Sequence, residues 1–223
     1  MRKYPGYFIT FEGGEGSGKT CQLRYLANYF QELGLPVVST REPGGTSISE
    51  QIRGVLHDLK NTEMHPRAET LLYQAARAQI VEQLVVPNLK EGKIVMSDRF
   101  FDSTLAYQGY GHRQDLGEIT LLVRYATGGL IPDLSVFFDV DVETGLNRRN
   151  GTTEWNRIDA YEHDFHQRVR QGYLELMKME PDRWASVDAN KNRDEVYCEL
   201  GRKIENRLAL NGFIERRRFG PER

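Results

Sequence analysis

The stretch from residue 13 to residue 20 limits the possible folds of this chain more than any other feature. It reads Gly13, Gly14, Glu15, Gly16, Ser17, Gly18, Lys19 and Thr20, which matches the pattern G-x-x-x-x-G-K-[ST]. Residues 7–11 before it are β-prone, and residues 23–33 after it carry apolar side chains at spacings of three and four. A glycine-rich turn between a strand and a helix is the context in which this pattern binds phosphate.

The chemistry of such a turn follows from its backbone. Successive N–H groups converge on an anion, and the start of the following helix adds its positive dipole end. We expect Lys19 to neutralise the β- and γ-phosphates of a nucleotide and Thr20 to ligate Mg²⁺. An ordinary glycine-rich turn would need neither side chain. The motif therefore predicts a P-loop that binds ATP through residues 13–20, but it does not identify a second substrate.

The rest of the chain alternates between strand and helix patterns. Further strands are expected at 37–40, 94–98, 134–139 and 185–188, and helices at 48–59, 66–90, 102–109, 115–127, 142–149, 159–179 and from 193 onward. Alternation of this kind implies βαβ units with right-handed crossovers. We predict an α/β chain with a three-layer P-loop fold, in which helices flank a five-stranded parallel sheet. The 223 residues fit a single domain, residues 1–223.

Composition narrows the function classes. Lys plus Arg number 30 and Asp plus Glu 32, and the resulting net charge of -2 argues against a large nucleic-acid surface. The sequence has no run of about 18 apolar residues, so no membrane span is expected. Cys21 and Cys198 are the only cysteines, which is too few for a disulfide framework and fits a reducing cytoplasm. His163 and His166 lie three apart in a polar helix and are expected to be solvated, not metal ligands.

The end of the third strand carries a second candidate site. Asp98 lies where side chains reach the ligand crevice of an open α/β sheet. A carboxylate there can hold Mg²⁺ directly or through water, and Arg99 beside it can meet a phosphate with its planar fork. A surface ion pair of little consequence is the alternative. The loop from Arg41 to Thr46 follows the second strand and should lie on the same edge of the sheet.

Tyr73 and Arg77 are four residues apart and therefore share one face of a helix. An aromatic ring and an arginine that point the same way suit a nucleobase, because the ring can stack on it and the guanidinium can donate to a base carbonyl. The alternative is a core aromatic residue beside a surface arginine.

Several motifs together give the chain a resemblance to the thymidylate kinases over nearly its whole length. They are Phe11-Glu12-Gly13, Thr40 to Thr46, Ala75-Ala76-Arg77, Asp98-Arg99-Phe100, Ala106 to Gly109, Pro132-Asp133-Leu134, Arg157-Ile158-Asp159 and Arg170 to Leu174. Each tripeptide alone is weak, but their order and spacing are specific. The resemblance implies transfer of the γ-phosphate of ATP to dTMP with Mg²⁺, giving dTDP and ADP, a step in dTTP synthesis.

The resemblance also implies roles for individual residues. Asp98 would serve the metal, Arg99 would bridge both phosphate groups, and Arg53 would contact the 5′-phosphate of dTMP. Around the nucleoside, the family places a stacking aromatic at Tyr73, an arginine to thymine O4 at Arg77, lining residues at Thr104 and Tyr107, and an acidic residue near the sugar 3′-OH at Glu15. Gln108, next to Tyr107, is expected to be a polar neighbour of the bound nucleotide.

In related members an arginine reaches the transferring phosphoryl group from the P-loop or from a mobile lid. Here Gly16 follows Glu15, so the P-loop offers no guanidinium, and the chain resembles the bacterial lid-arginine type. Its lid would span about 148–157, where it departs from that type at Asn150 and Thr152, positions that are often basic. The candidates are Arg148, Arg149 and Arg157; the match that continues through Ile158 and Asp159 puts Arg157 first and Arg149 second.

The stretch 66–90 carries apolar residues around more than one face. They are Leu71, Leu72, Ala75, Ala78, Ile80, Val81, Leu84, Val85 and Val86. A helix of this kind needs more than one partner surface. The resemblance implies a homodimer that forms through helices including this one.

Two alternatives stay open. The chain could be a P-loop kinase for another deoxynucleotide; a methyl group is worth only ~1–3 kcal/mol in a pocket, so dUMP would be a weaker substrate. It could instead be a regulatory protein that hydrolyses nucleotide slowly and signals by shape. A GTPase is disfavoured, because Asn190 to Arg193 lacks the aspartate of N-K-x-D and no D-x-x-G follows the third strand.

Overall fold

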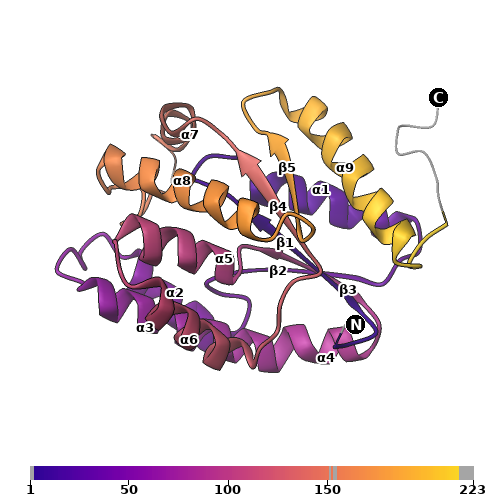
Figure 1. Cartoon of the computed structure of the whole chain (residues 1–223), viewed down its shortest axis with the longest axis horizontal. Coiled ribbons are helices and arrows are strands. Elements are labelled where there is room, and N and C mark those ends of the chain that lie inside the picture. The colour runs from indigo at the N-terminus through magenta and orange to yellow at the C-terminus, as the bar shows by residue number, and fades with distance from the viewer. Residues whose placement is uncertain (1–2, 151, 153–154, 216–223) are drawn as a thin grey trace.

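The computed structural model describes residues 3–150, 152 and 155–215. Its centre is a five-stranded sheet in the order β2-β3-β1-β4-β5. The strands are β1 (Tyr7–Glu12), β2 (Val37–Arg41), β3 (Ile94–Asp98), β4 (Leu134–Asp139) and β5 (Trp184–Asp188), and all neighbours pair in parallel. The carboxyl ends of the strands therefore meet along one edge (Figure 1). The predicted α/β class and parallel sheet are confirmed.

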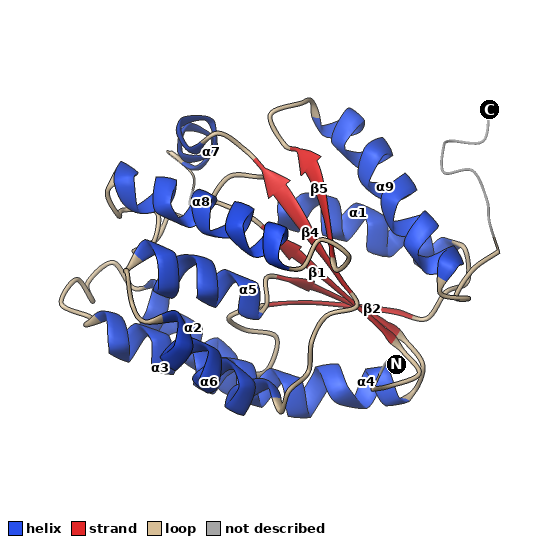
Figure 2. Ribbon diagram, viewed as in Figure 1, coloured by secondary structure: helices blue, strands red, loops and turns tan. Residues whose placement is uncertain are grey.

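Two layers of helices cover the sheet (Figure 2). Helices α1 (Lys19–Glu32) and α9 (Arg193–Leu210) lie on one face, while α3 (Pro66–Ile80), α5 (Phe101–Thr104), α6 (Leu116–Thr127) and α8 (His163–Met179) lie on the other. Two further helices are α2 (Ser47–His57), which packs on α3, and α7 (Val142–Arg149), which follows β4.

The alternation of side chains along β1 explains both layers. Ile9 and Phe11 pack in the core beneath α1 and α9, whereas Phe8 packs in the core beneath α3 and α6. Successive side chains of a strand point to opposite faces, so a strand that is buried on both faces is largely apolar. Thr10 and Glu12 share the face of Phe8, and their polar groups are hydrogen-bonded inside the protein.

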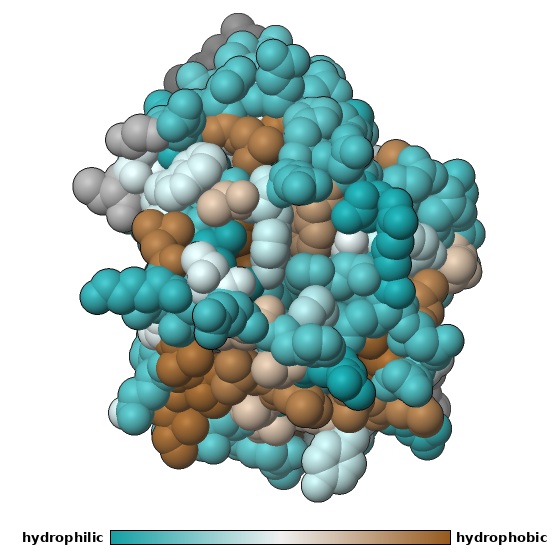
Figure 3. All heavy atoms as spheres, turned by 90° about the vertical axis from the view of Figure 1, so that its left-hand side faces the viewer, coloured by the Kyte–Doolittle hydropathy of each residue, from teal (hydrophilic) through white to brown (hydrophobic). Residues whose placement is uncertain are grey.

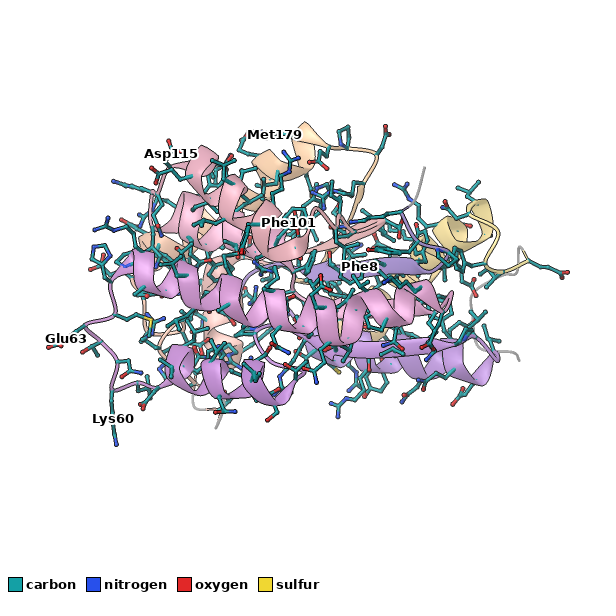
Figure 4. All side chains as sticks on the ribbon, turned by 90° about the horizontal axis from the view of Figure 1, so that it is seen from below. Phe8, Lys60, Glu63, Phe101, Asp115 and Met179 are labelled. Atoms are coloured by element: carbon teal, nitrogen blue, oxygen red, sulfur yellow. The ribbon has the colours of Figure 1, made fainter. Side chains whose placement is uncertain are left out.

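The predicted helix 66–90 is one continuous rod of three segments: α3, a π-helical turn η1 (Val81–Val85) and α4 (Val86–Lys90). Figure 4 shows this rod running across the underside between α2 and α6. The π turn lies directly before Pro87, whose ring has no N–H and would clash with the carbonyl of Gln83 in a regular α-helix. A second π segment, η2 (Leu105–Gly111), continues α5.

The prediction of a helix from residue 159 was wrong by four residues, because α8 begins at His163. Asp159 instead accepts hydrogen bonds from Arg149 and from the backbone N–H of Asn156, which holds it in the preceding loop. The helices of the described residues are all too short or too polar to cross a lipid bilayer.

A buried ion pair connects α5 to β4 and to the start of β5. Arg183, just before β5, donates two hydrogen bonds to the carboxylate of Asp102 at 2.7 and 2.8 Å, and Ser135 of β4 donates a third at 2.9 Å. Asp102 is fully buried. Because α5 follows directly after Arg99, this pair also fixes where the end of β3 meets the ligand edge.

We expect Asp102→Ala to lower the free energy of unfolding by about 3–5 kcal/mol, because the Arg183 guanidinium would stay buried without its partner. Urea denaturation measures this change. Lys178→Ala is the matched control, since it breaks an exposed ion pair with Glu175 and should not shift the midpoint. Equal shifts in the two variants would contradict a structural role for the buried pair.

Candidate active site

A cavity of about 820 Å³ opens at the carboxyl ends of the strands, beside β1. This is the topological switch point of the sheet, because the chain continues from β1 to strands on both of its sides. Its size suits small-molecule ligands. The P-loop, the loop after β2, the end of β3, η2, the end of α7 and residues 155–158 all contribute to its wall. The lining includes Glu15 to Cys21, Arg24, Arg41 to Pro43, Arg53, His57, Tyr73, Arg77, Asp98, Arg99, Ser103, Thr104, Tyr107, Gln108, Arg148, Arg149, Trp155, Asn156 and Ile158.

The P-loop has the backbone geometry that its glycines predict. Gly16 (φ 65°) and Gly18 (φ 87°) are left-handed, and a Cβ on Gly16 would lie 2.0 Å from the carbonyl oxygen of Gly145. Lys19 curls back over this turn, and its Nζ donates to the carbonyls of Gly13 (3.0 Å) and Gly14 (2.7 Å). The ammonium is therefore held above the loop that would receive phosphate.

The pKa of Lys19 is set by neighbours with opposite effects. Burial and the neighbouring Arg99 lower its pKa to about 8, although Asp98 and Glu15 act in the opposite direction. A bound phosphate would add negative charge next to the ammonium and so favour its protonated form.

Arg99 joins the P-loop to η2. Its backbone is left-handed (φ 71°), and its guanidinium donates to Glu15 Oε1 at 2.6 Å and to the carbonyl of Gly13 at 2.8 Å. The guanidinium carbon lies 4.9 Å from the ring centre of Tyr107, whose hydroxyl donates to the same Glu15 oxygen at 2.8 Å. Burial alone would raise the pKa of Glu15, but Arg99 and Lys19 outweigh it and lower the pKa to about 2. Glu15 is therefore a fixed negative charge inside the cavity.

Thr20 and Asp98 meet as the motifs predict. The Thr20 hydroxyl donates to Asp98 Oδ2, and both residues line the cavity next to Lys19. A hydroxyl and a carboxylate are hard oxygen ligands of the kind that hold Mg²⁺ together with substrate phosphates. The described part of the chain has no group of three or more His, Cys, Asp or Glu side chains that could hold a metal ion, at this site or at any other.

The helical residues Tyr73, Arg77, Thr104, Tyr107 and Gln108 form another part of the cavity wall. Tyr73 and Arg77 do share one face of α3, and Arg77 is fixed more firmly than the sequence predicts. Its Nε donates to the buried carboxylate of Glu42 at 2.8 Å, and its Nη1 donates to Thr104 Oγ1 at 2.7 Å.

The wall near the loop after β2 is basic. Arg53 lines it as predicted and donates to the carbonyl of Pro43 at 2.9 Å, while Arg41 is paired with Glu50. Burial and the charge of Arg41 lower the pKa of Arg53. His57 completes this wall; burial and Arg53 lower its pKa to about 3, so its ring is neutral at physiological pH.

The three lid arginines separate into two groups. Arg148 and Arg149 line the cavity; Arg148 donates to the carbonyl of Ala189 at 2.9 Å, and Arg149 is paired with Asp159 at 2.8 Å. Arg157 is buried away from the cavity wall, where it donates to Glu69 at 2.5 Å and to the carbonyl of Leu56 at 3.0 Å. Of the predicted lid, Gly151, Thr153 and Glu154 lie outside the described residues.

Sequence reasoning missed several residues of the cavity. Arg24 and His57 line it without belonging to any motif, and Trp155 and Asn156, which lie in the predicted lid segment, had been given no role. Glu12 is a further residue to which the sequence analysis gave no role. Its carboxyl group accepts hydrogen bonds from the backbone N–H of Phe100 at 2.9 Å and from the Ser103 hydroxyl at 2.6 Å. Two signals pointed to it: its place in the motif Phe11-Glu12-Gly13 and its position as a charged residue at the end of a largely apolar strand.

The strand order, the phosphate loop after β1 and the cavity beside it define a P-loop nucleotide-binding protein. Comparison with known proteins narrows this class. The family model for thymidylate kinase matches residues 11–200. A thymidylate kinase of Herpetosiphon aurantiacus is 46% identical over 218 residues, covering 86% of this chain and 92% of that protein. One from Roseiflexus sp. is 44% identical over 214 residues, covering 91% and 95%.

A solved structure agrees with these relatives. The crystal structure of thymidylate kinase from Ehrlichia chaffeensis superposes with a TM-score of 0.72 at 34% identity, covering 89% of this chain and 98% of that one. The chain belongs to the thymidylate kinase family.

The pKa of Lys19 gives a pH prediction for nucleotide binding. ATP affinity should be constant at about pH 7 and lower, begin to weaken as the pH approaches 8, and fall above pH 8 by at most about tenfold per pH unit, as the free protein loses the Lys19 proton. Calorimetric titration between about pH 7 and 9.5 measures this. Lys19→Arg keeps its charge, so its ATP affinity, whatever its value, should not change over that range. The same slope in both proteins would contradict the prediction.

Proposed function

We propose that this chain transfers the γ-phosphate of ATP to dTMP, giving dTDP and ADP, a step in the synthesis of dTTP. The observation that carries the proposal is one continuous cavity whose wall includes the P-loop, Arg99, Tyr73 and Arg77. Two nucleotides bound in this cavity would meet at their phosphates. Membership of the thymidylate kinase family supports the same activity.

On the ATP side, residues Gly13 to Thr20 bind the phosphates through backbone N–H groups and the Lys19 ammonium. Thr20 and Asp98 hold Mg²⁺, which supplies charge neutralisation to the phosphates when bound. The adjacent Thr20 hydroxyl and Asp98 carboxylate fit this ion, and both line the cavity at the foot of the P-loop.

On the dTMP side, Arg53 and Arg99 bind the 5′-phosphate, Tyr73 stacks on thymine and Arg77 donates to its O4. Thr104 and Gln108 line the base, and Tyr107 crowds the 2′ position of the sugar. Glu15 accepts from the 3′-OH; as an ionised carboxylate it has acceptor capacity in addition to its bonds with Arg99 and Tyr107.

The reaction needs no strong base. The dTMP phosphate has a second pKa near ~6 and is largely a dianion at pH 7. Catalysis consists of holding two phosphates in line and stabilising the charge that develops between them, with water excluded. Lys19 and Arg99 carry part of this charge, and one arginine of a lid at 148–157 carries the rest.

We assign that lid arginine to Arg149 or Arg148, both of which line the cavity. Arg157 anchors the base of the lid through its buried ion pair with Glu69. The exposed fraction of the Arg149 side chain is 15%, and its carboxylate partner Asp159 can release it when a more strongly charged phosphate arrives.

Acceptor specificity tests the proposed activity. In a coupled assay with ATP, ADP release should require dTMP, should be weaker with dUMP, and should stay near background with AMP, dGMP or no acceptor. Lys19→Ala should lower turnover by orders of magnitude while the protein stays folded. Equal rates with all acceptors would contradict the thymidylate assignment, and slow release that ignores the acceptor would favour a regulatory nucleotide-binding protein.

Alanine variants separate the lid arginines. Arg149→Ala or Arg148→Ala should lower kcat by at least about a hundredfold with nearly unchanged dTMP affinity, since the contact forms mostly in the transition state. Arg157→Ala should lower the melting temperature instead, because Glu69 would lose its ion-pair partner. Near wild-type turnover in both Arg148 and Arg149 variants would leave Lys19 and Arg99 to carry the charge alone.

We also propose that the chain forms a homodimer. Ile80, Val81, Val85 and Val86 of the 66–90 rod are buried in the core of the same chain, so they are not available to a partner. The surface that remains is an α3–α6 patch of Leu71, Leu121 and Tyr125, whose exposed fractions are 55%, 69% and 89%. Figure 3, which views the molecule from the left-hand side of Figure 1, shows apolar side chains gathered in its lower part, where α2, α3 and α6 lie in Figure 1.

Light scattering at micromolar concentration should give the mass of a dimer. Leu121→Glu should shift the protein to monomer, because it places a charge in the α3–α6 patch. Met179→Glu is the matched control: Met179 is 66% exposed at the end of α8, outside the patch, and its variant should stay dimeric. A monomeric wild-type protein would refute the proposal.

The site of action we propose is the cytoplasm. Cys21 and Cys198, the two cysteines of the sequence, are both free thiols, which fits a reducing compartment.

A further inference from the structure

Glu69 of α3 is a buried carboxylate that receives four hydrogen bonds, although no motif points to it. Its Oε1 accepts from Gln108 Nε2 at 2.8 Å and from His112 Nε2 at 3.0 Å. Its Oε2 accepts from Arg157 Nη2 at 2.5 Å and from the Tyr161 hydroxyl at 2.7 Å. The donors come from η2, from the loop before α8 and from the foot of the lid, so one side chain joins three segments around one end of the cavity.

The protonation state of Glu69 fixes the direction of these bonds. Burial would raise its pKa, but the hydrogen bond and charge of His112 and the charge of Arg157 outweigh burial and lower the pKa to about 2. An ionised carboxylate has acceptors and no donor. Gln108 must therefore turn its amide nitrogen toward Glu69, and its amide oxygen is left on the opposite side.

Gln108 is among the residues that line the cavity, together with Arg77 and Thr104. Thr104 lies one helical turn before Gln108 and accepts a hydrogen bond from Arg77 Nη1. Arg77 Nη2 carries two N–H groups. One donates to the carbonyl of Phe100 at 3.0 Å, and the other makes no hydrogen bond to the described residues. The cavity wall thus carries an acceptor on Gln108 and a donor on Arg77, which is hydrogen-bonded to Thr104 one helical turn before Gln108.

We propose that Glu69 is a positioning residue for base selection: by holding the nitrogen of the Gln108 amide, it presents the amide oxygen to the acceptor nucleotide, beside the N–H of Arg77. This inference rests on the proposed function. An acceptor next to a donor complements the imide edge of thymine or uracil, which offers a ring N–H beside a carbonyl. Cytosine offers the reverse pattern at the same edge, a ring acceptor beside an amino donor, and would meet like groups at both positions.

Gln108 alone does not determine which end of its amide faces the cavity. A glutamine side chain can turn either its oxygen or its nitrogen toward a ligand, and only the neighbouring group decides which. A site that hydrogen-bonds one base edge rejects a mismatched edge strongly because its own polar groups stay unpaired. If Glu69 could donate, Gln108 could reverse and donate to the ring nitrogen of cytosine, which would remove one of the two mismatches and leave the one at Arg77.

The test compares kcat/KM for dTMP and dCMP in wild type, Glu69→Gln, Tyr161→Phe and Gln108→Leu. The ratio of dTMP to dCMP should fall at least tenfold in Glu69→Gln, with KM for dTMP raised and KM for ATP unchanged. Tyr161→Phe is the matched control, because it removes another donor to Glu69 without touching Gln108, and its ratio should stay within about twofold of wild type. In the Gln108→Leu background, Glu69→Gln should have no further effect on the ratio.

A folded Glu69→Gln variant with the wild-type ratio overturns the proposal, as does an equal loss of selectivity in Tyr161→Phe. Should Glu69→Gln fail to fold, Glu69→Asp carries the test: it keeps the charge for Arg157 but withdraws the carboxylate from Gln108, and its ratio must also fall. Failure of the proposed function is a different outcome, since wild type would then show no ADP release with dTMP at all.

Discussion

The ion pair between Arg99 and Glu15 holds the candidate site together. The 2.6 Å contact joins the end of β3 to the P-loop, and the Tyr107 hydroxyl on the same carboxylate oxygen adds η2. Arg99 adopts a left-handed backbone to reach this position, a conformation that costs an ordinary residue of order 1–3 kcal/mol and persists only where its surroundings fix it. Glu12 supplies part of that support, because it accepts from the backbone N–H of Phe100, the next residue.

The site depends equally on which buried carboxyl groups are charged. Glu15 and Glu69 are ionised because cationic or hydrogen-bonding neighbours outweigh their burial. Glu12 is different: burial and the nearby charge of Asp102 raise its pKa to about 8, so it is protonated at neutral pH. Glu15 therefore keeps its negative charge at the cavity wall, where it meets Lys19 and Arg99, whereas Glu12, which is buried behind the P-loop near the charged Asp102, is neutral.

The sequence was informative where function rests on local patterns. The P-loop and the strand end at Asp98 and Arg99 could be predicted because a turn between strand and helix, and the end of an apolar strand, fix where side chains point. Glu69 and Arg157 could not be paired in advance, because 88 residues separate them and neither motif nor period connects them. The start of α8 could not be predicted either, because it depends on the ion pair between Asp159 and Arg149. Nor could the buried ion pair between Glu42 and Arg77.

The central claim is that one cavity brings two nucleotides together for direct phosphoryl transfer. The most direct measurement is a rapid-quench single turnover with ATP labelled in its γ-phosphate, in the presence of dTMP. The account predicts that label appears in dTDP at the same rate as ADP forms, with inorganic phosphate at background, because Arg99 and the lid hold the acceptor in line and exclude water. Label that appears mainly in inorganic phosphate, or at a rate independent of dTMP, would contradict it.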